Sequence, residues 1–110
     1  MRRVALALSA ALLLGCSVGG EGFDADRWRQ ARAEGCDPDN PRLAMYGDLR
    51  SDLMARRPAR ATVLDVLGPP DGQRRGSVEY MLGLNVIDCD SVEIDFAPRG
   101  GVSGVRYVQG

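Results

Sequence analysis

Histidine and lysine are missing from this 110-residue sequence, in which all 14 basic residues are arginine. Without histidine there is no imidazole base, no Ser-His-Asp or Cys-His pair, and no zinc site built on histidine. Without lysine there is no amine to form a Schiff base with a carbonyl substrate. Acid–base chemistry would fall to the carboxylates, none of which lies in a recognisable catalytic spacing. The composition therefore argues against an enzyme.

Long hydrophobic runs and an excess of positive charge are also missing. The longest apolar run, Val4–Leu14, has 11 residues, whereas a helix needs about 20 to cross a membrane. The formal net charge is −1, and 2 of the 14 arginines precede residue 16, so the rest of the chain carries 12 arginines against 15 acidic residues. A mildly acidic chain lacks the basic surface that nucleic-acid binding requires. We therefore expect no nucleic-acid partner.

The first 16 residues have the organisation of a bacterial signal segment: two arginines, an apolar run, and Gly15 before Cys16. Residues 13–16, Leu-Leu-Gly-Cys, resemble the lipobox, whose cysteine is diacylglycerylated and becomes the N-terminus after cleavage. This resemblance implies that residues 1–15 are a lipoprotein signal peptide and that Cys16 is the lipidation site, with two or three acyl chains such as palmitate. The alternatives are an ordinary signal peptide and a buried helix with a chance cysteine.

Residues 16–22 then form a lipidated, glycine-rich and flexible tether, and residues 23–110 form one small domain. Two or more acyl chains anchor a protein stably, whereas a single chain binds a membrane only marginally. Ser17 follows Cys16 where an acidic residue would favour the inner membrane. By resemblance to the sorting rules of diderm bacteria, we expect lipid anchorage in the outer membrane, facing the periplasm.

Cys36 and Cys89 are the two cysteines that remain. In an oxidising compartment two leftover cysteines most often pair, and we expect a disulfide between them. Closing a loop of about 54 residues stabilises a fold by roughly 4 kcal/mol in the chain-entropy model. Two free buried thiols, or a redox site without Cys-x-x-Cys spacing, are the alternatives.

Capping and turn residues predict two or three helices. Asp24 is a suitable N-cap for a helix over 25–33, and Phe23 can pack on Trp28 as a hydrophobic staple before the helix stops at Gly35. Asn40 is expected to cap a second helix that ends before Pro58. One face of this helix is apolar and comprises Leu43, Tyr46, Leu49 and Leu53, with Met45 and Met54 beside them.

A shorter helix over 60–67 is followed by Gly68 and two prolines, and we expect Gly68 to adopt the left-handed αL conformation. Asp71 and Gly72 continue the turn, and residues 73–77 are polar. Strands are predicted at 78–82, 92–96 and 102–108, because apolar and polar residues alternate there. Short connections favour an antiparallel three-stranded meander, covered on one face by the helices. The predicted fold is α+β, of order ααβββ.

Four short motifs together resemble the BamE-like (SmpA/OmlA) family of bacterial outer-membrane lipoproteins. They are Arg42-x-x-Met45-x-x-Asp48-Leu49, Val63-x-x-Val66-Leu67-Gly68-Pro69-Pro70, Tyr80-x-Leu82-Gly83, and Ile94-x-Phe96 with its glycine turn and Val102. The resemblance covers about residues 23–108 and implies association with the β-barrel assembly machinery. The chain departs from the family at residues 57–59, where the hydroxyl that usually caps the short helix is missing, and in its two cysteines.

These observations favour a non-catalytic envelope lipoprotein that binds another envelope protein, through a sheet edge or through the loop 83–91. One alternative is an inhibitor-like binding domain, because a tandem ααβββ unit resembles the β-lactamase inhibitory proteins. The other alternative is an enzyme. Asp88, Asp90 and Asp95 resemble a calcium ligand set but lack EF-hand spacing. We therefore expect no cofactor and no metal.

Overall fold

The computed structural model describes residues 22–110, so the predicted signal peptide, Cys16 and most of the predicted tether lie outside the described residues. The described part begins with helix α2 (Ala25–Gln30), the 3-10 helix η1 (Ala31–Glu34), α3 (Arg42–Arg56) and α4 (Arg60–Leu67). None of the helices between residues 22 and 110 is long and apolar enough to cross a membrane.

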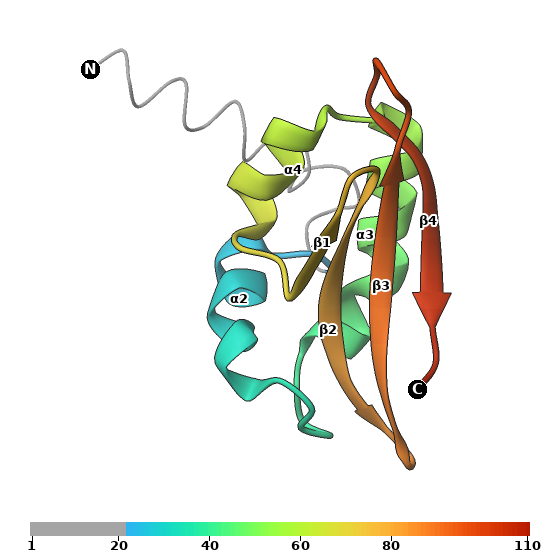
Figure 1. Cartoon of the computed structure of the whole chain (residues 1–110). Helices are drawn as coiled ribbons and strands as arrows, with labels where there is room; N and C mark the ends of the chain where they lie inside the picture. Colours follow the sequence, from blue (N-terminus) through green and yellow to red (C-terminus); the bar gives the residue numbers. More distant parts are fainter. Residues whose placement is uncertain (1–21) are drawn as a thin grey trace, which may run out of the picture.

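The strands β1 (Gly72–Arg74), β2 (Ser77–Asn85), β3 (Asp88–Phe96) and β4 (Val102–Val108) form one antiparallel sheet in the order β1-β2-β3-β4. The helices cover one face of this sheet (Figure 1). The predicted α+β fold, with N-terminal helices packed on a β-meander, is confirmed. The number of strands was wrong by one, because no strand was predicted before residue 78, whereas β1 pairs Gly72 with Glu79 and Arg74 with Ser77.

Both ends of the first helical segment follow the predicted caps. The Asp24 carboxylate accepts a hydrogen bond from the Arg27 amide at 3.1 Å, and the rings of Phe23 and Trp28 lie 5.9 Å apart. The α-helix ends at Gln30, earlier than expected, and the chain continues as a 3-10 helix to Glu34. Gly35 then adopts a positive φ of 52°, a conformation that glycine tolerates at no steric cost.

The second and third helices differ from expectation only in the details of their ends. The Asn40 side chain accepts a hydrogen bond from the Arg42 amide at 2.9 Å, so it satisfies the first turn of α3 from one residue before the N-cap Pro41. No side chain caps α4, which follows Ala59. Gly68 ends α4 with φ 83° and ψ −169°, so the prediction of an αL residue was wrong. Its φ is positive, but its ψ is extended because the chain leaves directly toward the prolines.

The core lies between the helices and the sheet. Its fully or nearly fully buried members are Phe23, Trp28, Met45, Leu49, Leu53, Val63, Val66, Leu67, Val78, Tyr80, Leu82, Val92, Ile94, Val102 and Val105. The predicted apolar face of α3 contributes Leu49 and Leu53 and places Leu43 and Tyr46 at the margin of the core, and Met45 beside this face is also buried. The alternating residues Val92 and Ile94 of β3 point inward as expected.

One charged side chain is fully buried within this apolar layer. Arg42 is 0% exposed, and its guanidinium lies 4.5 Å from the centre of the Trp28 ring and 5.9 Å from that of Tyr80. It donates hydrogen bonds to the Trp28 carbonyl at 2.8 Å and to the Met81 carbonyl at 3.1 Å. Burial lowers the pKa of Arg42, and the Asp71 carboxylate, 3.7 Å from Nη1, partly offsets this. Arg42 thus joins α2, α3 and β2.

Candidate functional site: an apolar hairpin tip

The segment 83–91, expected to be a loop, is most of a β-hairpin. Strands β2 and β3 remain paired up to Asn85 and Asp88, and Val86 and Ile87 alone form the turn. The register shifts once between Met81 and Gly83, where a β-bulge bends β2. The prediction of a loop was wrong because residues 85–88, Asn-Val-Ile-Asp, contain none of the glycine pairs that mark tight hairpins.

Two large apolar side chains at the tip of this hairpin are exposed to solvent. Val86 is 86% exposed and Ile87 is 81% exposed, whereas the next most exposed large hydrophobic residue in the described chain, Tyr107, is 36% exposed. Val86 also has a positive φ of 66°, which is rare for a β-branched residue and costs about 1–3 kcal/mol. Figure 1 shows the hairpin projecting beyond the helices at one end of the sheet. A strained apolar turn in water does not stabilise the domain itself.

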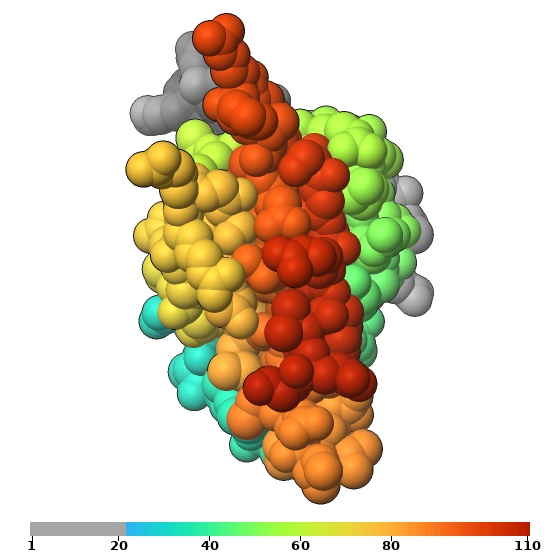
Figure 2. Space-filling model, turned by 45° about the vertical axis from the view of Figure 1, so that its right-hand side comes forward, coloured from blue at the N-terminus to red at the C-terminus, as the bar shows by residue number. Residues whose placement is uncertain are grey.

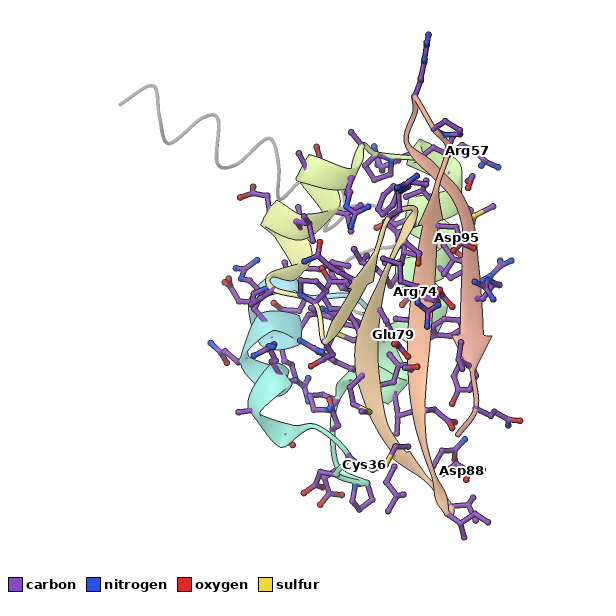
Figure 3. All side chains as sticks on the ribbon, in the orientation of Figure 1. Cys36, Arg57, Arg74, Glu79, Asp88 and Asp95 are labelled. Carbon is purple, nitrogen blue, oxygen red and sulfur yellow. A yellow bond between two sulfur atoms is a disulfide. The ribbon has the colours of Figure 1, made fainter. Side chains whose placement is uncertain are left out.

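A disulfide anchors the base of the hairpin. Cys36, in the connection between η1 and α3, is bonded to Cys89 on β3, with their Cα atoms 5.4 Å apart. The predicted disulfide is therefore present. Cys36 and Asp88 lie at the same end of the molecule in Figure 3, next to the hairpin turn. The bond fastens β3 to the helical layer three residues from Val86.

Close backbone packing gives a second anchor. The Leu84 amide donates a hydrogen bond to the Asp37 carbonyl at 3.3 Å. Gly83 next to it has a φ of 134°, and a Cβ atom there would lie 2.8 Å from the same carbonyl oxygen. Only glycine allows this approach without displacing the loop. The hairpin therefore rests directly on the loop that carries Cys36.

A buried carboxylate on β3 gives a third anchor. Asp90 is 1% exposed, and it accepts hydrogen bonds from the Tyr107 hydroxyl, from Asn85 at 3.2 Å and from the Gly110 amide at 3.4 Å. These hydrogen bonds, that of Tyr107 first, lower the pKa of Asp90. Burial, and then the hydrogen bond to Asp90, raises the pKa of Tyr107, whose ring packs edge-on against Tyr46 of α3 at 5.1 Å.

The other predicted contact, a free sheet edge, is available on one side only. Beside the short β1, the Met81 amide donates to the Asp71 carboxylate at 2.8 Å and the Met81 carbonyl accepts from Arg42. Side chains thus occupy that edge of β2. On the other side β4 forms the margin of the sheet, and within residues 22–110 it pairs with β3 alone. Strand β4 therefore offers the second possible contact.

The acidic residues that resembled a calcium ligand set have separate partners. Asp88 is exposed beside the turn, Asp90 binds Tyr107, and Asp95 pairs with Arg106 at 3.0 Å. Over the part of the chain that the structure describes, no three acidic or cysteine residues are placed to hold a metal ion.

The outer face of the sheet carries charges that neutralise one another. Glu93 lies 3.1 Å from Arg74 and 2.9 Å from Arg106, and its side chain is only 12% exposed. Glu79 lies directly opposite Glu93, and its carboxylate accepts a hydrogen bond from Ser91 at 2.7 Å instead of an arginine. Figure 3 shows Arg74, Glu79 and Asp95 on this face. Each of these side chains thus has a hydrogen-bond or ion-pair partner on the sheet itself.

No protein-family model, no curated protein and no solved structure matches this chain. The choice of the hairpin tip as the candidate site therefore rests on its geometry alone. Sequence reasoning located the segment and the disulfide but missed the turn. The available signal was the pair Val86-Ile87 between the polar residues Asn85 and Asp88. Two apolar residues with a polar residue on each side are too few to form a buried strand.

Proposed function

We propose that this protein is a non-catalytic lipoprotein of the bacterial envelope that binds another envelope protein through the tip of its β2–β3 hairpin. The observation that carries the proposal is the exposure of Val86 and Ile87 on a turn held by three separate anchors. Two adjacent apolar side chains, exposed on a rigid support, form an apolar patch that contact with a partner would remove from water.

Rigidity matters because ordering a flexible contact segment reduces affinity. Each side chain immobilised on binding costs about 0.5–1.5 kcal/mol, and a preformed turn avoids much of the additional cost of ordering its backbone. The disulfide fixes β3 directly after the turn, and the Asp90 network ties β3 to Asn85 of β2 and to Tyr107 of β4, so Ile87 is held in its binding position before the partner arrives. The strain at Val86 is consistent with selection for contact instead of stability.

The lipid anchor belongs to the same proposal. Cys16 would hold the domain at the outer membrane, on its periplasmic side, through the short tether of residues 16–22, so that the partner must reach the domain there. The resemblance to BamE-like lipoproteins favours a component of the β-barrel assembly machinery as that partner. Labelled palmitate fed to cells should be incorporated into the full chain and lost in Cys16→Ser. Equal labelling of both chains would remove the lipid anchor from the proposal.

Site-specific photocrosslinking in intact cells tests the contact. A photoreactive amino acid at position 87 of the full chain should give protein adducts that mass spectrometry can identify. The same group at Arg50, an exposed position on α3, is the matched control, and a third probe at Ser103 tests the edge of β4. Adducts from position 103 alone would move the contact to the sheet edge, and adducts from no position or equally from Arg50 would contradict the proposal.

A double substitution separates binding from folding. Val86→Gly with Ile87→Ser supplies glycine at the residue whose φ is positive and keeps a two-residue turn. Because the backbone strain is relieved, the free energy of unfolding should stay equal or rise by about 1 kcal/mol. The partner adducts, monitored from a probe at the exposed Asp88, should disappear. A variant that folds normally and retains all adducts would show that the apolar tip is not the contact.

A further inference from the structure

A hollow of about 480 Å³ lies at the end of the sheet opposite the hairpin tip. It separates the β1–β2 turn, which contains Arg75, from the β3–β4 turn, which contains Arg99, and the first residue of α4, Arg60, forms part of its wall. Figure 2 shows it as a notch between the yellow β1–β2 turn and the orange β3–β4 turn. Its size is within the range of small-molecule sites, about 300–1,000 Å³.

We propose that this hollow binds a small organic anion, in which a carboxylate or a phosphate monoester is joined to a flat apolar body. Two properties of the wall support this ligand class: a concentration of positive charge without acidic neighbours, and an apolar surface beside it.

The charge comes from three arginines. Arg60, Arg75 and Arg99 line the hollow, and no acidic residue does. Within residues 22–110 none of the three has a carboxylate within ion-pair distance, whereas Arg74 and Arg106 on the outer face of the sheet both do. Arginine binds carboxylate and phosphate oxygens through its planar fork of N–H donors. An oxyanion in the hollow would supply the counter-charge that the chain itself does not.

Arg60 is fixed in a geometry that leaves donors for a ligand. Its Nη1 donates to the Arg75 carbonyl at 2.8 Å, and its Nη2 donates to the Gln73 side chain and to the Arg74 carbonyl, each at 3.0 Å. A guanidinium has five N–H donors, so two remain, one on Nε and one on Nη1. All three acceptors are uncharged, so they orient Arg60 without neutralising it.

The apolar part of the wall selects the body of the ligand. Phe96, Ala97 and Pro98 line the hollow beside the arginines, and the Arg60 guanidinium lies 5.7 Å from the centre of the Phe96 ring. A flat apolar group can pack on these side chains while its oxyanion faces Arg60. Inorganic phosphate has the charge but not the body, and a neutral aromatic alcohol has the body but not the charge. We expect both to bind more weakly than a molecule that has both.

Calorimetric titration of the full chain in detergent with phenyl phosphate, benzoate, inorganic phosphate and benzyl alcohol tests the proposal. Phenyl phosphate or benzoate, or both, should bind at least about ten-fold more tightly than benzyl alcohol, because they make a charge-assisted hydrogen bond that the alcohol lacks. They should also bind about ten-fold more tightly than inorganic phosphate, because only they bury an apolar ring on the wall. The stronger of the two tells whether the site prefers a phosphate or a carboxylate. Equal affinity for phenyl phosphate, benzoate and inorganic phosphate, or no binding at all, would overturn the proposal.

Two substitutions locate the binding. Arg60→Gln should weaken binding by about ten-fold or more, and Arg75→Gln, at an exposed turn position that cannot disrupt the core, should weaken it to a smaller extent. Arg27→Gln removes one arginine charge from the exposed surface of α2 and is the matched control. Unchanged affinity in both hollow variants, or an equal loss in the Arg27 control, would place the binding elsewhere. These results do not depend on the hairpin tip, so they test the hollow separately from the proposed function.

Discussion

Replacing the buried Arg42 should reveal how a charged side chain can occupy the centre of this core. The structure gives it two hydrogen bonds to carbonyls and a position against two aromatic rings. Arg42→Ala removes both hydrogen bonds, the cation–π contact and most of the side-chain volume. We expect it to lower the free energy of unfolding by about 4–5 kcal/mol. That is a large fraction of the roughly 5–15 kcal/mol of a typical domain.

Arg42→Met separates volume from charge. The thioether side chain fills most of the same space beside the two rings and removes a charge whose burial is costly, as the lowered pKa of Arg42 indicates. What remains is the cost of two carbonyls without donors, about 1–3 kcal/mol. We therefore expect Met to cost about 2 kcal/mol, clearly less than Ala. Asp71→Asn removes only a partly exposed carboxylate 3.7 Å away and should cost less than about 1 kcal/mol.

Urea unfolding with linear extrapolation measures these differences. Trp28, the single tryptophan, reports on the core by fluorescence. Because Arg42 contacts this ring, far-ultraviolet circular dichroism is needed as an independent probe. If Met were as destabilising as Ala, the charge and its hydrogen bonds would outweigh the volume. If both variants cost less than about 1 kcal/mol, the proposed link between α2, α3 and β2 through this side chain would be wrong.

Three further variants test the support of the hairpin. Cys36→Ser with Cys89→Ser opens a loop with a sequence separation of 53 residues and should lower the free energy of unfolding by about 4 kcal/mol in the chain-entropy model, measured in urea. Gly83→Ala should cost about 3 kcal/mol in the same assay because of its φ of 134° and its close contacts, whereas Gly104→Ala, whose Cβ would have ordinary contacts, should be nearly neutral. Asp90 has a lowered pKa, so its carboxylate stabilises the fold above about pH 4 and this stabilisation is lost as the pH falls through the folded-state pKa. Unfolding free energies measured from pH 7 to pH 3 should therefore fall more steeply for the wild type than for Asp90→Asn, and parallel curves would contradict this role.

Strong local signals in the sequence predicted most of the fold. The cap at Asp24, the breaks at Gly35 and Gly68, and the alternation around Ile94 each depend on neighbouring residues alone, so a reading of local pattern finds them. The pairing of Cys36 with Cys89 was also predictable, because these are the two cysteines left after Cys16 and two cysteines in an oxidising compartment usually form a disulfide.

The features that the sequence did not predict depend on distant contacts. Strand β1 contains no apolar residue and is held by pairing with β2 and by Arg60, which is 12 residues before Gly72 in the chain. Arginine is rarely buried, and the local pattern around Arg42 did not predict its burial, because only ring contacts and carbonyls from other elements make that burial possible. The turn at Val86 has no glycine, so its positive φ cannot be read from local preference.

The three anchors of the hairpin have a common explanation in the strain at its tip. A turn that costs about 1–3 kcal/mol at Val86 would relax by fraying if only the last ladder pair held it. Cys89 is three residues from Val86, and Asn85 and Asp90 are joined across the strands by a hydrogen bond. Opening the tip therefore requires breaking contacts with the helical layer as well as with β4. The strained turn therefore depends on the several contacts at its base. Without those contacts the turn would relax into another conformation or become mobile.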